Sequence, residues 1–288
     1  MKSLLLAAAL LAATVSANAD FDDLVRSHQM LWSEGALQLE VRKSLDPASP
    51  LSPDTRFRAE SRIEEALPYL YIEAVEDLPV DSYDTVGDRL AADDALFRAL
   101  SEQAADGALS ESAAFARDLH AVVVVYRFPL FGERGLEAAF VHHEQPFPIP
   151  RILGFAPARA FTGLVILAQG ELPSHGKDLR VRARAALLPR LYDEDMNPVL
   201  SPEMCDPQAL RKWGVAGYAY SGEEDSLEAF RERIGDLPLR TKARAVFGRN
   251  ATDLLLSAEV ARQLLSRRQN RELLRDGRIL IILDPGER

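Results

Sequence analysis

Six basic residues alternate along two short stretches in the second half of the chain. They are Arg180, Arg182 and Arg184 in one stretch and Arg240, Lys242 and Arg244 in the other. Every second side chain of a strand points to the same face, so each trio is predicted to line one face. If the two strands are neighbours, the six cations form a surface for an anionic envelope component or an acidic protein partner. The alternative is a solvated sheet face balanced by some of the 44 acidic residues.

Two loops resemble part of a nucleotide-binding or metal-binding motif but lack residues that the motif requires. The segment Gly170 to Lys177 has one residue too many between its glycines for a phosphate loop, and Asp178 replaces the Ser or Thr that binds magnesium. The segment Asp193 to Asn197 resembles the start of a calcium loop, but Pro198 stands where that loop needs glycine. A polar turn is therefore predicted over residues 191–198, and no cofactor or metal is expected.

The remaining candidates for catalysis lack the partners that the chemistry requires. His142 and His143 are adjacent, and adjacent side chains on a helix point about 100° apart, which favours a solvated helix end over a metal site. Asp118 and His120 share one strand face, yet no G-x-S-x-G motif supplies a nucleophile. Cys205 is the single cysteine and is predicted to be a small buried hydrophobe. These observations favour a protein without enzymatic activity.

The first 19 residues have the pattern of a cleavable secretory signal peptide. Lys2 precedes an apolar run from Leu4 to Val15, and Ala17 and Ala19 occupy the two positions that a signal peptidase inspects. Cleavage after Ala19 is predicted, with a periplasmic location for the mature chain. The apolar run is shorter than the roughly 20 residues that cross a bilayer, and no transmembrane segment is expected in the mature chain.

Composition limits the class of partner. The net charge is −10, so a nucleic acid is not an expected partner, because binding phosphates needs a basic surface. The hydrophobic fraction of 47% is ordinary for a globular protein. Prolines 146, 148 and 150 disfavour regular structure and divide the chain into two predicted domains, residues 20–150 and 151–288.

Helices and strands are predicted in both halves. In the first half, helices are expected over residues 20–33, 88–103 and 133–142 and from Ser52 onward with a break near Pro68, and strands over 35–44 and 118–128. In the second half, strands are expected over 161–168, 179–188, 215–220, 239–247 and 278–284. A helix is expected over 226–234. Ser257 and Ser266 are predicted to cap two later helices, and Gly277 is predicted to close the second of them. Because strands do not alternate regularly with helices, the predicted fold is α+β, with mainly antiparallel sheet and packed helices.

Several segments of the second half resemble a known family. They are Ala160 to Ile166, Gly170 to Gly176, Leu188 to Asp195, Pro238 to Ala243, Ser257 to Glu259 and Arg278 to Leu283. They are similar to an uncharacterised family of periplasmic proteins from spirochaetes and, more distantly, to LPP20-type lipoproteins and flagellar outer-membrane-ring assembly domains. The resemblance covers roughly residues 145–288, and the chain departs from the lipoprotein members in lacking a lipid-attachment cysteine.

Three functions remain open at this point. The first is an exported, non-enzymatic envelope protein that mediates protein–protein interaction, with periplasmic flagella as the setting that the resemblance implies. The second is a module that binds an anionic envelope component through the two basic trios. The third is a hydrolase whose site the sequence does not reveal.

Overall fold

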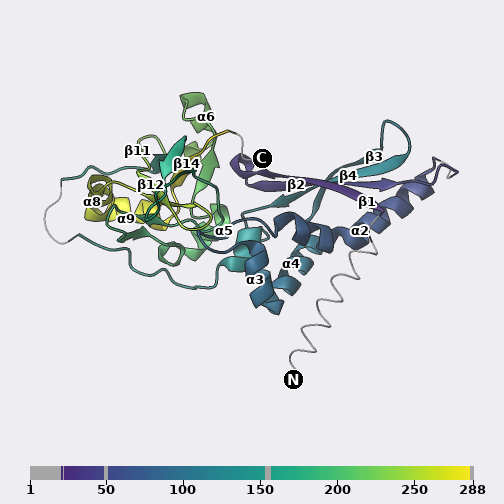
Figure 1. Cartoon of the computed structure of the whole chain (residues 1–288), viewed down its shortest axis with the longest axis horizontal. Coiled ribbons are helices and arrows are strands. Elements are labelled where there is room, and N and C mark those ends of the chain that lie inside the picture. Colours follow the sequence, from purple (N-terminus) through teal and green to yellow (C-terminus); the bar gives the residue numbers. More distant parts are fainter. Residues whose placement is uncertain (1–20, 22, 49–50, 153–156, 286–288) are drawn as a thin grey trace, which may run out of the picture. The chain divides into compact units, whose positions relative to one another are not determined.

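The computed structural model describes residues 21, 23–48, 51–152 and 157–285, and the chain forms two compact units. Of the described residues, those before 30, from 38 to 74 and from 101 to 128 belong to the first unit, and those from 30 to 37, from 75 to 100 and from 129 onward belong to the second. Figure 1 shows the elements of both units, coloured along the chain. The predicted signal peptide, residues 1–19, lies outside the described residues.

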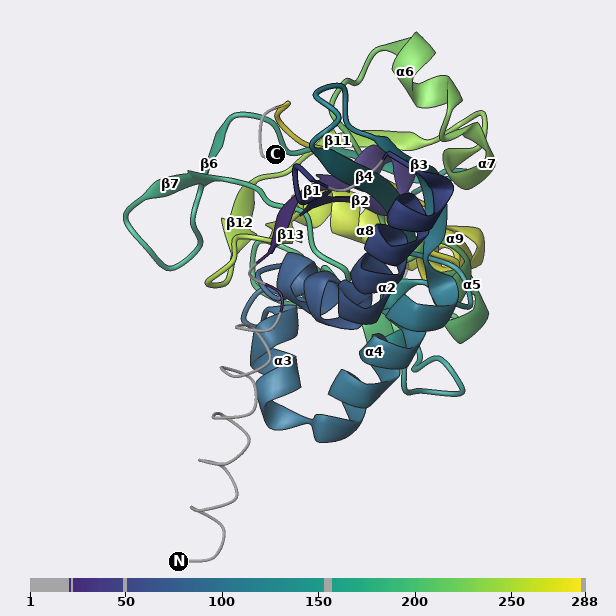
Figure 2. The same ribbon diagram turned by 90° about the vertical axis from the view of Figure 1, so that its right-hand side faces the viewer.

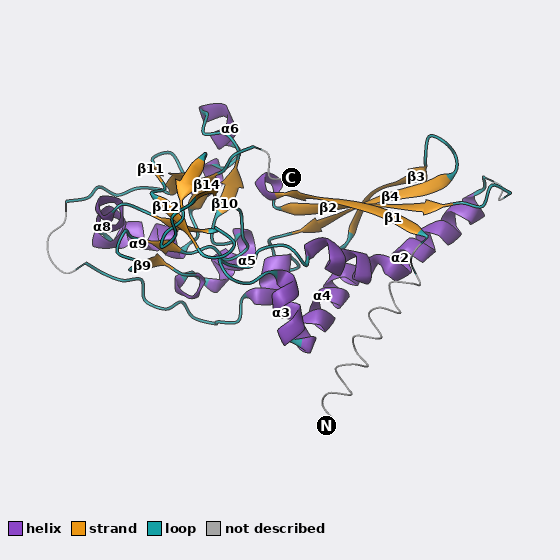
Figure 3. Ribbon diagram, in the orientation of Figure 1, coloured by secondary structure: helices purple, strands orange, loops and turns teal. Residues whose placement is uncertain are grey.

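The first unit is built on a four-stranded sheet with the order β1-β2-β4-β3. The strands are β1 (Leu24–Leu31), β2 (Ala36–Ser44), β3 (Leu109–Phe115) and β4 (Ala121–Pro129). Strands β3 and β4 pair antiparallel. The long helix α2 (Pro53–Val75) covers one face of this sheet (Figures 1 and 3).

The core of the first unit lies between α2 and the sheet. Alternate residues of β2 and β4 are buried, among them Leu39, Val41, Val122 and Val124. Tyr71 of α2 packs on Phe128, with their ring centroids 4.5 Å apart. The predicted strands over 35–44 and 118–128 are thereby confirmed, because their period of two marks the buried face.

Three predictions for the first half are wrong in detail. Residues 24–31 form strand β1 and not a helix, and β1 pairs with β2, which follows it after only four residues. Helix α2 runs through Pro68 without ending there. The helix predicted over 88–103 is divided at Asp93 into α3 (Val86–Ala92) and α4 (Asp94–Gly107). The segment 133–142 contains a short 3-10 helix, η2 (Leu136–Phe140).

A four-stranded parallel sheet forms the centre of the second unit, with the order β10-β14-β5-β11. Its strands are β5 (Leu164–Leu167), β10 (Gly217–Ala219), β11 (Leu239–Lys242) and β14 (Ile279–Ile282). All four residues of β14 are buried, as expected for a strand covered on both faces. The prediction of an α+β fold is confirmed, but the expectation of mainly antiparallel pairing is wrong for this sheet.

Short helices cover the parallel sheet. Helices α6 (Glu224–Glu228) and α7 (Arg231–Ile234) bury Leu227 and Ile234 against Val165 and Leu280. The other helices of this unit's C-terminal part are α5 (Pro207–Trp213), α8 (Ala258–Ser266) and α9 (Arg268–Arg275). In the described part of the chain, no helix combines the length and hydropathy needed to cross a membrane.

A second, mixed sheet has the order β12-β13-β8-β9. Its strands are β8 (Leu191–Tyr192), β9 (Pro198–Leu200), β12 (Ala245–Phe247) and β13 (Asp253–Leu255). Strands β6 (Glu171–Pro173) and β7 (Arg180–Arg182) form a separate antiparallel hairpin, which projects from the second unit in Figure 2.

Of the helix ends and strands predicted in the second half, some are confirmed and others are wrong. Ser257 caps α8 by accepting a hydrogen bond from the Val260 N–H, and Gly277 closes α9 with a φ of 61°. Ser266 does not cap α9, because that helix starts one residue later, after Arg267. The strand predicted over 239–247 is two strands, β11 and β12, which belong to different sheets.

Candidate functional site

The loop from Pro79 to Thr85 is attached to the strand-rich part of the second unit by its main chain. The N–H groups of Leu187 and Leu188 donate to the carbonyls of Pro79 and Val80, at 3.1 and 2.7 Å. On the other side of the loop, the Asn250 N–H donates to the Ser82 carbonyl at 3.0 Å. The loop is therefore held between two segments that follow it by more than 100 residues in the chain.

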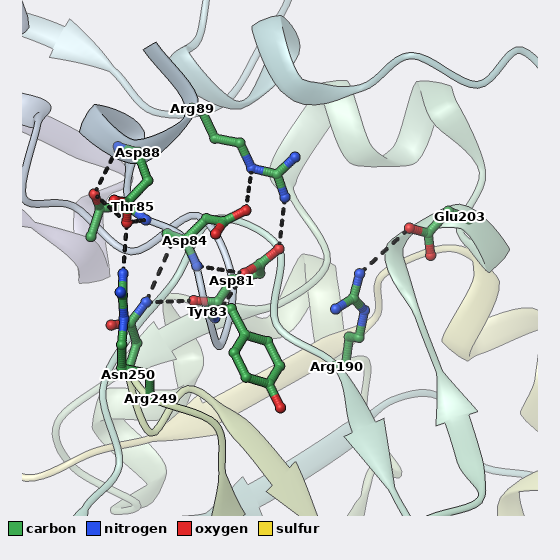
Figure 4. A network of polar contacts seen from close by, with 10 residues as sticks. All are labelled: Asp81, Tyr83, Asp84, Thr85, Asp88, Arg89, Arg190, Glu203, Arg249 and Asn250. Carbon is green, nitrogen blue, oxygen red and sulfur yellow. Dashed lines mark hydrogen bonds and ion pairs between the residues drawn. The ribbon is translucent and has the colours of Figure 1, made fainter. Parts of the chain in front are cut away.

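Asp81 fixes the conformation of this loop. Its side chain is buried and accepts hydrogen bonds from the N–H groups of Tyr83 and Asp84, at 2.9 and 3.0 Å, which makes an Asx-type turn. Arg89, from α3, bridges Asp81 and Asp84 with nitrogen–oxygen distances of 3.0 and 2.9 Å. Figure 4 shows this network. The result is a loop whose tip, Tyr83, has little freedom in its main chain.

A second set of contacts joins the loop to the turn before β13. The side-chain amide of Asn250 donates to the carbonyls of Asp81 and Asp84, at 3.0 and 3.5 Å. Arg249 pairs with Asp88 at 2.7 Å (Figure 4). Asp88 also takes part in a capping box with Thr85 at the start of α3, and these hydrogen bonds lower its pKa.

The loop from Pro79 to Thr85 places Tyr83 beside three other rings. Tyr83, Tyr192 and His175 each make an edge-type contact with Phe247, with centroid distances of 5.9, 5.9 and 6.2 Å. The Tyr83 residue is 51% exposed. We name these four residues the aromatic patch. Edge-to-face packing orients the rings, so the patch is a firm, partly apolar surface with polar groups at its margin.

Charged side chains border the aromatic patch. Arg190 and Glu203 form an ion pair of 3.7 Å near Tyr192, and Arg244 pairs with Glu194 at 3.5 Å. Burial raises the pKa of Tyr192, with a further contribution from nearby Asp253. This margin can form ion pairs and hydrogen bonds with a bound molecule.

Two carboxyl groups of the second unit have strongly altered acidity but lie in the interior. Burial raises the pKa of Asp253 to about 6, although the Arg190 N–H donates to one of its oxygens at 2.9 Å. Burial holds the pKa of Glu137 well above its usual range, and nearby Arg233 opposes this rise. Both residues have 0% exposure, so neither carboxyl is presented to a substrate at the surface.

The first basic trio is divided between a hairpin strand and the loop after it. Arg180 and Arg182 lie on β7, as predicted, and both are exposed. Arg180 donates to the Glu171 carbonyl, and Arg182 lies 3.8 Å from Asp284. Arg184 follows the strand, and its N–H donates to the Ala251 carbonyl at 3.0 Å.

The second trio lies in a different sheet, so the two trios are not on neighbouring strands. Arg240 and Lys242 belong to β11, and Arg244 lies between β11 and β12. Arg240 pairs with Glu224 at 2.9 Å. The expectation of six cations on neighbouring strands is thereby corrected, because β7 pairs only with β6 and β11 pairs with β5. Binding of an anionic partner by these residues stays a prediction.

The other motifs adopt structural roles in the described chain. Asp193 accepts hydrogen bonds from the N–H groups of Asp195 and Asn197, which confirms a polar turn. His143 contacts the Cys205 carbonyl at 2.9 Å, and Cys205 is buried, as predicted. The expectation that Asp118 and His120 share a strand face is wrong, because both lie in the turn before β4. Asp118 accepts a hydrogen bond from the His120 N–H and pairs with Arg42, and these contacts lower its pKa. Among the described residues, no group of three or more His, Cys, Asp or Glu is arranged to hold a metal ion.

No pattern in the sequence predicts the aromatic patch as a unit. Its four residues are separated by up to 164 positions, from Tyr83 to Phe247, and no spacing rule connects them. One signal was present: Asp81-Ser82-Tyr83-Asp84 has the composition of an Asx turn, and such a turn exposes the side chains at its tip.

Two family models match the chain. Residues 24–133 match the model of the N-terminal domain of Treponema pallidum Tp0624, and residues 163–285 match the model of its second domain. No curated protein matches the chain. The aromatic patch draws Tyr83 from the first matched segment and its other three residues from the second. The two matches, in chain order, support the assignment of this chain to a spirochaete family of uncharacterised proteins represented by Tp0624.

Proposed function

We propose that this is an exported, non-enzymatic protein of the cell envelope that binds another protein through the aromatic patch. The observation that carries the proposal is the half-exposed ring of Tyr83 on a loop fixed by Asp81, Arg89 and Asn250. Tyrosine and arginine are enriched among the residues that dominate binding energy at protein interfaces. A fixed loop also lowers the entropy lost on binding.

The charge near the patch indicates the chemistry of the partner. Six acidic residues lie within three positions of a patch member in the chain: Asp81, Asp84, Asp178, Asp193, Glu194 and Asp195. Four basic residues lie within the same range: Lys177, Arg190, Arg244 and Arg249. Acidic groups are in excess, so the partner that fits is a protein segment with exposed Lys or Arg. Such a side chain can pack over a tyrosine ring and pair with a carboxylate.

Binding accounts for the site better than catalysis does. The two carboxyls whose raised pKa values would suit an acid or base, Glu137 and Asp253, are buried completely. The groups that do reach the surface at the patch are rings and ion pairs. The resemblance to flagellar outer-membrane-ring assembly domains makes envelope and flagellar proteins the first partners to test.

Site-specific photo-crosslinking tests the proposal. A photoreactive phenylalanine analogue at position 83 should capture one envelope protein, and the captured peptide should contain Lys or Arg. The matched control is position 69, because Tyr69 is 45% exposed, close to the 51% of Tyr83, but lies on α2 outside the patch. Capture of the same proteins from both positions would contradict the proposal.

The affinity of the captured partner then gives the decisive comparison. Tyr83→Ala should weaken binding more than about tenfold, as loss of an interface hot spot does. Tyr69→Ala should leave the affinity unchanged. Both variants should stay folded, each losing about 0.5–1.5 kcal/mol of stability with its one ring contact, Phe21 for Tyr69 and Phe247 for Tyr83. Equal affinity of the two folded variants would exclude the aromatic patch as the interface.

A further inference from the structure

Strand β11 forms one edge of the parallel sheet in the second unit. Among the described strands it pairs only with β5 in this sheet. The N–H groups of Leu239 and Ala243 donate to carbonyls on the β5 side, at 2.8 and 2.9 Å. In a parallel pair, the residues that bond to the neighbour alternate with residues whose main chain points the other way. The main-chain groups of Arg240 and Lys242 therefore point away from the sheet.

The outward main-chain donors of β11 are free to bind a further strand. In the described part of the chain, neither the Arg240 N–H nor the Lys242 N–H donates a hydrogen bond to another residue. Both residues are exposed, so water satisfies these groups in the free protein. An extended segment can add to an open edge of this kind by pairing with its N–H and C=O groups.

A hollow lies beside this edge, on the face of the sheet that α6 and α7 cover (Figure 2). Its volume is about 200 Å³, which is enough to receive an apolar side chain. Pro238 and Arg240 line it from the β11 side, and Leu227 and Ile234 supply apolar surface from the helices. Strand addition typically combines main-chain pairing at an edge with pockets for alternate side chains, and both features are present here.

The two basic side chains of β11 point to the same face as the hollow. Arg240 is level with Val165 of β5, and Val165 packs with Leu227 and Ile234 of the covering helices. Side chains alternate along a strand, so Lys242 lies on this face as well. An added strand would therefore place every second side chain beside these cations and next to the hollow.

The charges of β11 indicate which kind of segment fits. Arg240 pairs with Glu224 at 2.9 Å, whereas Lys242 forms no ion pair within the described residues. A second copy of the chain would bring its own β11 cations opposite these, and like charges in opposite positions destabilise a strand pair. A carboxylate opposite Lys242 stabilises the pair for the same reason. The open edge therefore favours an acidic segment of a different protein.

We infer that β11 accepts an extended segment of another protein as an additional strand, with an apolar side chain in the hollow and a carboxylate opposite Lys242. Pro238, beside the hollow, and Lys242 are four positions apart, so the segment carries an apolar and an acidic residue at that spacing. No residue of this surface belongs to the aromatic patch, and the inference does not depend on the proposed function.

Two short synthetic peptides with capped ends test the inference. Both are built on threonine; one has leucine four residues before aspartate, and the other has aspartate four residues before leucine, as parallel and antiparallel addition require. At least one should bind with a dissociation constant of about 1 mM or lower in an NMR titration. At about 10 mM peptide, hydrogen exchange of the Arg240 and Lys242 N–H groups should slow at least about threefold, while that of Thr241, which faces β5, stays unchanged.

N-Methylation of the bound peptide distinguishes strand addition from other modes of binding. Only every second N–H of an added strand faces the edge that it joins. Methylating one alternate set of peptide nitrogens should therefore weaken binding at least about tenfold, and methylating the other set should change it less than about twofold. Equal effects of the two sets would overturn the inference.

A charge reversal locates the binding on β11. Lys242→Glu should weaken binding of the aspartate peptide at least about threefold and strengthen binding of the same peptide with lysine in place of aspartate. Lys177→Glu is the matched control, since Lys177 is also exposed but lies in the turn between β6 and β7. The inference is also overturned if neither peptide binds up to about 10 mM, or if the two lysine variants behave alike.

Discussion

The side-chain amide of Asn250 donates a hydrogen bond of 3.0 Å to the main-chain carbonyl of Asp81, although 169 residues separate the two in the chain. Asn250 is 8% exposed and Asp81 is 6% exposed, so water cannot readily replace this contact. The same amide reaches the Asp84 carbonyl. One side chain therefore fixes both ends of the turn that carries Tyr83.

Asn250→Ala is expected to destabilise the second unit by about 1–3 kcal/mol, because it leaves buried carbonyls without their donor. Unfolding in urea followed by tryptophan fluorescence measures this, since Trp32 and Trp213 are the two tryptophans of the chain and both belong to the second unit. Asn197→Ala is the control, because Asn197 lies in an exposed turn and its amide bonds to Asp193. Equal losses in the two variants would refute the role assigned to Asn250.

Gly248 allows the turn before β13 to approach the Tyr83 loop. A Cβ atom at this position would lie 2.3 Å from the Ser82 Cβ, and the φ of Gly248 is +94°. Gly248→Ala is expected to cost more than about 3 kcal/mol, because backbone strain and steric overlap add. Urea unfolding of this variant, followed by tryptophan fluorescence, measures the loss of stability.

A substitution at Gly132 separates the effect of backbone strain from that of steric overlap. Its φ is +100°, yet a Cβ atom there would meet nothing within 4 Å. Gly132→Ala should therefore cost only the strain, about 1–2 kcal/mol. If both glycine variants lose the same stability, the close approach of Gly248 to Ser82 is not important to folding.

Asp253 is expected to make stability depend on pH in an unusual direction. Its pKa is raised to about 6 from the usual value of 3.8, mainly by burial. Between these two values the folded state binds more protons than the unfolded state, so the contribution of this group is full at low pH and is lost as pH rises through about 6. A shift of this size corresponds to about 3 kcal/mol.

Asp253→Asn removes this titration and keeps an oxygen that can accept from the Arg190 N–H. The stability of the variant minus that of the wild type should rise between about pH 4 and pH 6 and then level off. Unfolding curves at several pH values measure the difference. A difference that stays flat across that range would show that Asp253 titrates at an ordinary pKa.

Glu137 and Arg233 are expected to be coupled in the interior of the second unit. Burial lowers the pKa of Arg233 to about 10, and Glu137 opposes this shift. Arg233→Met should cost about 1–3 kcal/mol, because it removes the buried hydrogen bond from Arg233 to the Ile279 carbonyl and the positive charge that favours the ionised form of Glu137. The double variant Glu137→Gln with Arg233→Met should be more stable than Arg233→Met alone.

A double-mutant cycle in urea measures this coupling energy. The coupling should grow as pH rises through the elevated pKa of Glu137, because only the ionised carboxylate attracts the Arg233 guanidinium. Strict additivity of the two substitutions at every pH at which the protein stays folded would contradict the coupling.

Local sequence was sufficient for elements whose signals lie within a few residues. The apolar run Ile279–Ile282 indicated strand β14, and Ser257 and Gly277 indicated a helix start and a helix end. A cap acts on the next turn of helix, and alternation acts on neighbouring side chains, so both can be read without knowing the rest of the fold.

Pairing between distant strands could not be read in this way. The run 239–247 looks continuous, but β11 pairs with β5 and β12 pairs with β13, which places its basic residues in separate surroundings. In the first unit, β2 lies between its neighbour in the chain, β1, and the distant strand β4. Hydrogen bonds between strands depend on which segments meet, and that is decided by the burial of the whole core.

The candidate site also combines local features, which the sequence predicts, with contacts between distant segments, which it does not predict. The sequence by itself determined that Asp193 to Asn197 would form a polar turn and that Arg180 and Arg182 would share a strand face. Only the tertiary structure decided that Tyr83 meets Phe247 and that Arg182 faces Asp284. The physical reason is that a turn is stabilised by its own side chain and main chain, whereas a binding surface consists of groups that become neighbours only when distant segments pack together.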